Sequence, residues 1–178
     1  MGAIRTRTRQ QALRRIPTII LVVLALCACG QPAPDTARVT RVFDGDSFIA
    51  DSADGRQTEV RLFGIDAPER RQPWSRRSRE ALRGLVKDRE VLLEEVTVDT
   101  YGRTVAVVYR SSDGLEINRE MIRLGHAWVY RRYTSDPSLI ALEEQARDAG
   151  IGLWSLPEAE RLPPWQWRSQ NRRSRDRE

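Results

Sequence analysis

Residues 60–69 read VRLFGIDAPE, and this stretch decides what kind of fold the chain can form. Charged and apolar residues alternate at its start, as they do in a strand that turns one face toward a core. The strand then ends on two acids, Asp66 and Glu69, with Pro68 fixing the backbone between them. A strand that ends on two carboxylates, with Arg61 near its start, indicates a functional site as well as a core.

The neighbouring segments predict a small barrel. ARVTRVFD and DSFIAD also have strand patterns, and Asp54-Gly55 predicts a hairpin turn between DSFIAD and TEVRLFGID. Two further strands, EVLLEEVTV and RTVAVVYR, come after a helical segment. Helical patterns occupy residues 74–88, 116–125 and 135–154. The predicted fold is mainly β with helices (α+β): a five-stranded OB-type Greek-key barrel with about three helices.

The first 29 residues have the composition of a signal peptide, of the lipoprotein type. Five arginines and no acid precede the apolar run IPTIILVVLALCA, which is too short to span a membrane comfortably. The chain's two cysteines, Cys27 and Cys29, close this segment, so the folded domain has no disulfide. LCAC resembles the lipobox of bacterial lipoproteins, which makes Cys29 the expected lipidation site. A soluble exported protein and an uncleaved anchor are the alternatives.

The charge of the chain is unevenly distributed. The net charge is +5, and the five arginines of residues 1–15 account for all of it, because residues 30–178 hold 25 basic and 25 acidic residues. We expect residues 30–37 to be a linker and residues 38–156 to be the folded domain. Residues 157–178 form a basic tail rich in proline, tryptophan and arginine, which we expect to be loosely held. An anionic substrate therefore has to be bound by a local arrangement of arginines.

Four acidic residues are expected to converge. Asp44 and Asp46 flank Gly45 in VFDGDSF, and this spacing puts both carboxylates on one face of an extended segment. Asp66 and Glu69 stand at the end of the next strand of the hairpin. Such a cluster repels itself unless a cation is bound, and its oxygen donors favour calcium, magnesium or manganese over zinc.

Two arginines accompany these acids. Arg61 lies five residues before Asp66, so a regular strand would place the two side chains on opposite faces. A bulge at Gly64 would restore a shared face. Arg103 follows a turn in DTYGRT. Two guanidinium groups beside a carboxylate-held metal predict a phosphate clamp, in which Glu69 orients or deprotonates a water.

DGDS, VRLFGIDAPE and DTYGRT, in this order and spacing, resemble the staphylococcal nuclease family. INREMIRLGHAWVY and GLW extend the resemblance, which covers roughly residues 38–156. The resemblance implies an OB-barrel fold and calcium-dependent hydrolysis of phosphodiester bonds in DNA and RNA, with 3′-phosphate products.

By position, the resemblance implies that Asp46, Asp66 and the backbone carbonyl of Ala67 hold one calcium ion, with magnesium and manganese as alternatives. Asp44 lies beside this metal, and the resemblance leaves open whether it is a ligand. The residues with implied catalytic roles are Arg61, Glu69 and Arg103.

The resemblance also bears on substrate binding. Tyr101 matches a tyrosine that contacts the substrate, and we expect Arg70 and Arg71 to contact it because they directly follow the catalytic glutamate. The chain departs from the family at Thr100, where a lysine is frequent, and at Arg131, where the family type has a tyrosine. Both departures concern substrate binding rather than chemistry.

The favoured prediction is an exported, calcium-dependent endonuclease that acts on DNA and RNA as a monomer. It would be lipid-anchored at the cell envelope, periplasmic or secreted, with the lipid anchor as its contact with the membrane. The alternative is a catalytically silent OB-fold module that binds nucleic acid or protein, and a third hypothesis is a structural lipoprotein of the envelope. Silent repeats of the family lose the carboxylates or arginines, and this chain keeps them.

Overall fold

The structure, a computed structural model, describes residues 36–175, with side chains through residue 172. The expected signal peptide and the lipidation site Cys29 lie outside the described residues, as does almost all of the expected linker. Within the described part, no helix is both long and apolar enough to cross a membrane.

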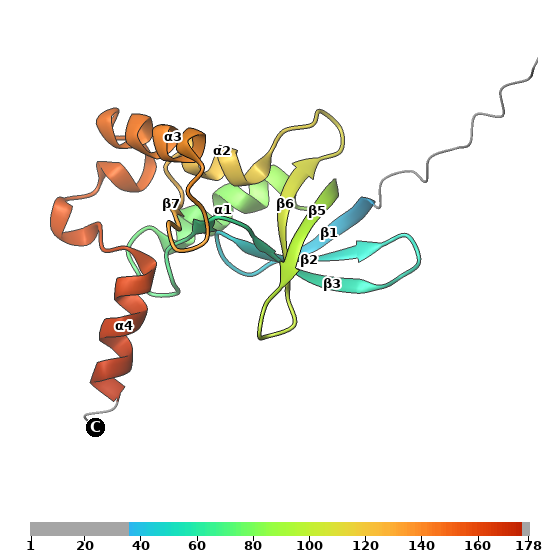
Figure 1. Cartoon of the computed structure of the whole chain (residues 1–178), viewed down its shortest axis with the longest axis horizontal. Coiled ribbons are helices and arrows are strands. Elements are labelled where there is room, and N and C mark those ends of the chain that lie inside the picture. The colour runs from blue at the N-terminus through green and yellow to red at the C-terminus, as the bar shows by residue number, and fades with distance from the viewer. Residues whose placement is uncertain (1–35, 176–178) are drawn as a thin grey trace, which may run out of the picture. The chain divides into compact units, whose positions relative to one another are not determined.

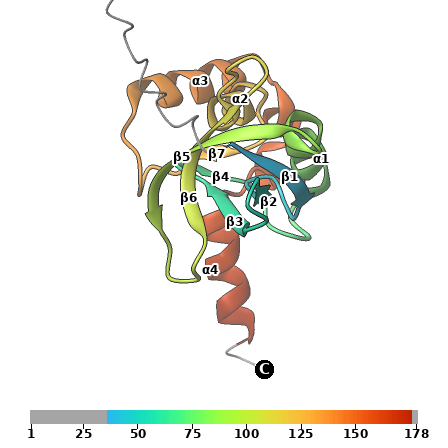
Figure 2. The same cartoon turned by 90° about the vertical axis from the view of Figure 1, so that its right-hand side faces the viewer.

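Five strands close into a barrel in the order β1-β2-β3-β6-β5, with β5 returning to β1 (Figures 1 and 2). In chain order, they are β1 (Thr36–Val42), β2 (Ser47–Ser52), β3 (Gln57–Leu62), β5 (Glu90–Val98) and β6 (Thr104–Arg110). Paired neighbours are antiparallel except β3 and β6, which run parallel. The predicted α+β barrel is confirmed.

The three predicted helices gather on one side of the barrel (Figure 1). They are α1 (Ser75–Val86), α2 (Ile117–Arg123) and α3 (Pro137–Asp148). Alternate strand residues and one face of each helix meet in a single core, in which the side chains of Phe48, Val60, Leu82 and Met121 are fully buried. Burial of this apolar surface is the main stabilising term of the fold.

A fourth helix replaces the loosely held tail expected from the sequence. Two short 3₁₀ turns, η1 (Gly152–Ser155) and η2 (Glu158–Glu160), lead to α4 (Pro164–Arg175). Proline suits the first turn of a helix, where its missing N–H is not needed. Trp165 stacks on Tyr130, with ring centroids 5.5 Å apart and an interplanar angle of 7°. The sequence lacks a long apolar repeat here because only the beginning of α4 packs on the domain.

The hairpin of β2 and β3 sets the geometry on which the site depends. The predicted Asp54-Gly55 turn is confirmed, and the register pairs Ser47 with Arg61. The two chains stay close beyond this pair, because the Leu62 N–H donates to the Asp46 carbonyl at 2.8 Å. The DGD loop (residues 44–46) is therefore held beside the end of β3.

The chain turns sharply between β3 and the short strand β4 (Ile65–Asp66). Gly64 has a φ of +74°, a backbone conformation that favours glycine. Its carbonyl accepts from the N–H of Tyr130 at 2.8 Å. This turn, rather than a bulge within a continuous strand, resets the facing of the side chains that follow it.

Two contacts fix the segment after the turn. β4 pairs with β7 (Trp128–Val129), which places Asp66 opposite Trp128. The buried amide of Asn118 on α2 donates to the carbonyls of Phe63, at 2.9 Å, and Ala106, at 3.1 Å, and accepts from a backbone N–H of β6. Helix, barrel and turn are thus held together immediately behind the site.

Gly45, between the two aspartates of the DGD loop, is required by a close approach. A Cβ there would lie 1.8 Å from Ser78 Oγ and 2.8 Å from Ala67 Cβ. We predict that Gly45→Ala destabilises the protein by about 1–3 kcal/mol, because α1 or the DGD loop has to move. Urea denaturation in chelator measures the change.

Gly84→Ala is the matched control for this prediction. Gly84 lies in α1 with open space around it, so alanine is expected to stabilise by roughly 0.5–1 kcal/mol. A Gly45→Ala variant as stable as the wild type would contradict the close approach.

Candidate active site

A pocket of about 600 Å³ lies where the DGD loop, the ends of β3 and β4 and the beginning of β6 meet. It brings together eight of the predicted site residues: Asp44, Asp46, Arg61, Asp66, Ala67, Glu69, Tyr101 and Arg103. Arg70 and Arg71 are exposed and do not line it. Their contact with substrate stays a prediction.

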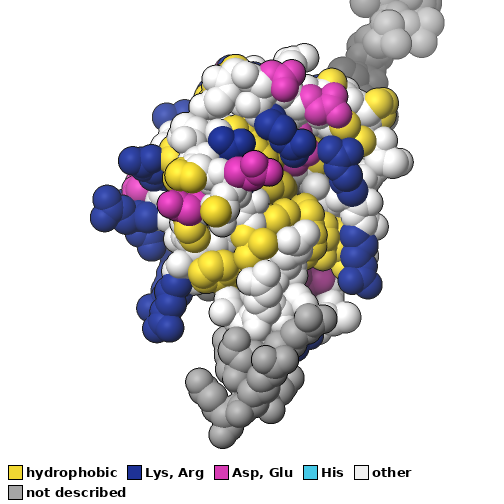
Figure 3. Space-filling model, turned by 90° about the vertical axis from the view of Figure 1, so that its left-hand side faces the viewer, with side chains coloured by type: hydrophobic (Ala, Val, Ile, Leu, Met, Phe, Trp, Pro, Cys, Tyr) yellow, Lys and Arg dark blue, Asp and Glu magenta, His cyan; other side chains and the backbone are white. Residues whose placement is uncertain are grey.

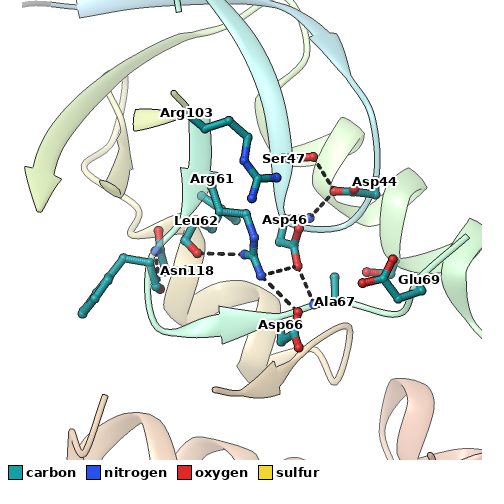
Figure 4. Close-up of polar contacts among 12 residues, drawn as sticks. Asp44, Asp46, Ser47, Arg61, Leu62, Asp66, Ala67, Glu69, Arg103 and Asn118 are labelled. Atoms are coloured by element: carbon teal, nitrogen blue, oxygen red, sulfur yellow. Dashed lines mark hydrogen bonds and ion pairs between the residues drawn. The ribbon is translucent and has the colours of Figure 1, made fainter. Parts of the chain in front are cut away.

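Arg61 joins the two buried aspartates. Its Nη2 lies 3.1 Å from Asp46 Oδ2 and 3.0 Å from Asp66 Oδ1, while its Nη1 donates to the Leu62 carbonyl at 2.9 Å (Figure 4). The turn at Gly64 makes this contact possible, since it brings residues 61 and 66 to the same side despite their odd spacing. One guanidinium therefore bridges two carboxylates that face a common point.

Each aspartate is fixed by the backbone. Asp46 is 6% exposed and its Oδ2 accepts the N–H of Ala67 at 2.5 Å. Asp66 is 1% exposed and lies within the β4–β7 pair. Such supports reduce the rotational freedom that each carboxylate would lose on binding a ligand.

The Asp44 carboxylate bonds within its own turn rather than with Arg61. Its Oδ1 accepts from the Asp46 N–H at 3.1 Å and from Ser47 Oγ at 2.7 Å, so this carboxylate closes the DGD turn (Figure 4). These bonds orient Asp46 toward Arg61. Whether Asp44 also contacts a metal stays a prediction.

Arg103 approaches from the start of β6 and points toward the same carboxylates (Figure 4). Its Nε donates to Asp99 Oδ2 at 2.8 Å and its Nη2 lies 2.7 Å from the same oxygen. Tyr101, at the rim, is 84% exposed, and the Arg103 guanidinium lies over its ring at 5.5 Å. Asp99 thus aims Arg103, while Nη1 is left outside this pair.

Glu69 is held at its backbone and its side chain. Its N–H donates to Gln72 Oε1 at 2.9 Å. Its Oε1 accepts from Arg168 of α4, and this carboxylate is 36% exposed. It is accessible enough to contact a water.

Arg168 was missed at the sequence level. Its guanidinium also forms a fork with Asp66, with distances of 3.1 Å from Nη1 to Oδ1 and 2.8 Å from Nη2 to Oδ2. Burial lowers the pKa of Arg168, but the bonds to Asp66 and Glu69 outweigh this and raise it above the usual range. The available signal was Trp165 and Arg168 three residues apart after Pro164, which puts both on one helix face.

Aromatic residues of the pocket were also missed. Tyr130 and Tyr133 line it and pack edge to face, with ring centroids 4.9 Å apart. Arg131, between them, instead bonds Glu143 of α3 at 2.9 Å. At position 131, where the family type has a tyrosine, this chain therefore has an arginine that forms an ion pair with Glu143.

The buried Asp46 carboxyl has a perturbed pKa. Burial raises it well above the usual value, Arg61 opposes the rise, and the neighbouring Asp44 and Asp66 add to it. The site thus contains more negative charge than Arg61 alone compensates.

The donor set fits a hard divalent cation. Among residues 36–175, no group of three or more Asp, Glu, His or Cys side chains is arranged to hold a metal ion. The pair Asp46 and Asp66 would need backbone and water oxygens to complete a coordination shell, and calcium and magnesium accept both. The N–H of Ala67 donates to Asp46 Oδ2, which places this residue beside the carboxylate pair.

Basic and acidic side chains are interspersed on one face of the described part of the chain. On the face seen in Figure 3, basic side chains lie at both sides and across the upper part, with acidic ones among them, and apolar side chains gather below. Basic side chains therefore form no single continuous patch on this face.

We predict that Asp46→Asn changes the pH dependence of stability. Because the folded pKa of Asp46 is raised, the folded state binds more protons than the unfolded state, and stability falls as pH rises from about 4 toward that pKa. The variant lacks this pH dependence. Between about pH 4 and the raised pKa, the free energy of unfolding of metal-free Asp46→Asn is therefore expected to increase relative to that of the wild type as pH rises. Urea denaturation in chelator at several pH values measures the difference.

Asp113→Asn provides a control of opposite sign. A hydrogen bond from Arg110 lowers the pKa of Asp113 to about 2, so its contribution is present above about pH 4 and lost as pH falls toward 2. A wild type and an Asp46→Asn variant with parallel pH curves would contradict the raised pKa.

Comparisons with known proteins identify the family. A family model described as staphylococcal nuclease homologue matches residues 59–156. The chain is 39% identical over 164 residues to the protein ParB of Escherichia coli, covering 86% of this chain and 91% of that protein. It is 42% identical over 132 residues to an uncharacterized endonuclease of Escherichia coli O157:H7, with coverages of 74% and 83%.

A further relative is a micrococcal nuclease of Shigella flexneri, 37% identical over 167 residues, which cover 88% of this chain and 92% of that protein. The family model includes Arg61, Asp66, Glu69 and Arg103, whereas α4 lies beyond its end. The barrel, the arrangement of these side chains and the extent of the matches lead to one conclusion: the chain belongs to the staphylococcal nuclease family.

Proposed function

We propose that the protein is a metal-dependent endonuclease that hydrolyses phosphodiester bonds of DNA and RNA. The observation that carries this proposal is Arg61, shared by the buried Asp46 and Asp66 in a pocket that also holds Arg103 and Glu69. Family membership and the nuclease names of its relatives support it.

We assign one calcium ion to the site, with magnesium or manganese as alternatives. Asp46, Asp66 and the Ala67 carbonyl would hold it, because their oxygens are the donors that such ions prefer. When bound, the ion supplies positive charge beside the phosphate, where negative charge grows in the transition state.

The arginines bind the substrate phosphate. Arg103 lines the pocket and has Nη1 outside its pair with Asp99, so this nitrogen would donate to a phosphate oxygen. Arg61 lies at the carboxylates and contributes its charge at the same point. Preorganised guanidinium groups stabilise an oxyanion more in the transition state than in the ground state.

Glu69 holds the attacking water. As the water oxygen bonds to phosphorus, its proton passes to the Glu69 carboxylate. The bond between phosphorus and the 5′ oxygen breaks, its electron pair stays on that oxygen, and a proton from solvent completes the 5′ hydroxyl. The phosphate remains on the 3′ end.

We also propose that the protein is exported and acts as a monomer. The basic and apolar composition of residues 1–29 supports a signal peptide. Lipidation at Cys29 would place the nuclease at the cell envelope, and its absence would give a periplasmic or secreted enzyme.

The test is digestion of single- and double-stranded DNA and of RNA by residues 30–178, which include the compact unit Pro32–Glu178. We predict cleavage with calcium, loss of cleavage in chelator and a fall in kcat of roughly 10²–10⁴-fold in Glu69→Gln, because a general base is removed without a change of shape. Arg61→Ala should also lose activity. Glu144→Gln, on the exposed surface of α3, is the control and should retain it.

Absence of cleavage under every metal condition would refute the proposal. If nucleic acid were then still retained in a salt-sensitive manner, the silent OB-fold binding module would be the better account.

A further inference from the structure

The C-terminal segment, beyond the region matched by the family model, contacts the active site at three points. Arg168 bonds both oxygens of Asp66 and one oxygen of Glu69. Gln72, whose Oε1 accepts the Glu69 N–H, donates its own amide to the carbonyl of Leu162 just before α4. The water-handling glutamate is therefore tied to this segment through its side chain and, by way of Gln72, through its backbone.

The position of Arg168 is fixed by packing. Trp165, one turn earlier, stacks on Tyr130, and Pro164 is buried. The Arg168 guanidinium lies 6.0 Å from the centre of the same Tyr130 ring, with 34% of the side chain exposed. Such a side chain is aimed at the carboxylates by its helix.

The two contacts of Arg168 respond differently to a metal ion. Arg168 and Arg61 together engage both oxygens of Asp66. The guanidinium of Arg168 competes with a divalent ion for the Asp66 oxygens, and the ion repels the guanidinium as well. Glu69 is outside the proposed ligand set, so its bond to Arg168 is not subject to this competition.

We propose that Arg168 is a positioning residue for Glu69, which releases Asp66 and retains Glu69 when metal binds. This inference rests on the proposed nuclease function. Removal of Arg168 then has two opposite effects: the metal loses a competitor at Asp66, and Glu69 loses the donor that orients its carboxylate toward water.

The experiment compares Arg168→Gln with the wild type, both as residues 30–178. Calorimetric titration of the metal-free proteins with calcium is expected to show binding about 5- to 10-fold tighter in the variant. Steady-state digestion of DNA is expected to show kcat lowered about 10- to 100-fold with KM within about twofold. Tighter metal binding combined with slower turnover is the signature of the proposal.

Two further variants sharpen the comparison. Arg168→Lys should recover part of the lost kcat, because an ammonium group can still hold one carboxylate. Arg83→Gln removes the same charge from the exposed face of α1, away from the pocket, and should leave the calcium affinity unchanged. Thermal unfolding in chelator checks that all variants are folded.

Other outcomes overturn the proposal in distinguishable ways. Unchanged or weaker calcium binding in Arg168→Gln would exclude competition at Asp66. Tighter binding with unchanged kcat would make Arg168 a competitor only, and a raised KM with unchanged kcat would make it a phosphate ligand. A wild type that binds calcium without cleaving would refute the nuclease function alone, and the calorimetry would still decide the competition.

Discussion

The shared bond of Arg61 to Asp46 and Asp66 is the interaction on which the rest of the site depends. Asp46 is only 6% exposed and Asp66 only 1% exposed, so their carboxylates lose hydration and repel each other. Buried charges of this kind are tolerated only when an opposite charge pairs with them, as Arg61 does here. Arg61 does so incompletely, which is why burial and the neighbouring acids raise the pKa of Asp46. The remaining negative charge is what makes the site suitable for a cation.

The barrel and its connections hold these closely spaced charges in place. The β2–β3 register sets the DGD loop beside the end of β3, and the turn at Gly64 brings Asp66 back toward Arg61. Pairing of β4 with β7 and the amide of Asn118 hold the turn from behind. Each support comes from a different element, so the site is rigid without contributions from flexible surface side chains.

Much of this could be predicted from the sequence. Strand alternation and the Asp54-Gly55 turn predict the hairpin, and the motifs predict which acids and arginines meet, because motif residues sit at the ends of regular elements. The sequence indicates that Gly64 can bring Arg61 and Asp66 to one face, but not that it does so by a turn rather than a bulge, since this depends on the φ of that one glycine. The role of Arg168 could not either: α4 packs through its first turns only, and a short contact of this kind leaves no periodic apolar pattern.

Metal binding between Asp46 and Asp66 is tested most directly by an anomalous difference map from a calcium-soaked crystal of residues 30–178. We expect one peak roughly 2.3–2.6 Å from carboxylate oxygens of Asp46 and Asp66 and from the Ala67 carbonyl, with the Arg168 guanidinium no longer at Asp66. A peak elsewhere in the molecule, or none between the two aspartates at saturating calcium, would contradict this expectation.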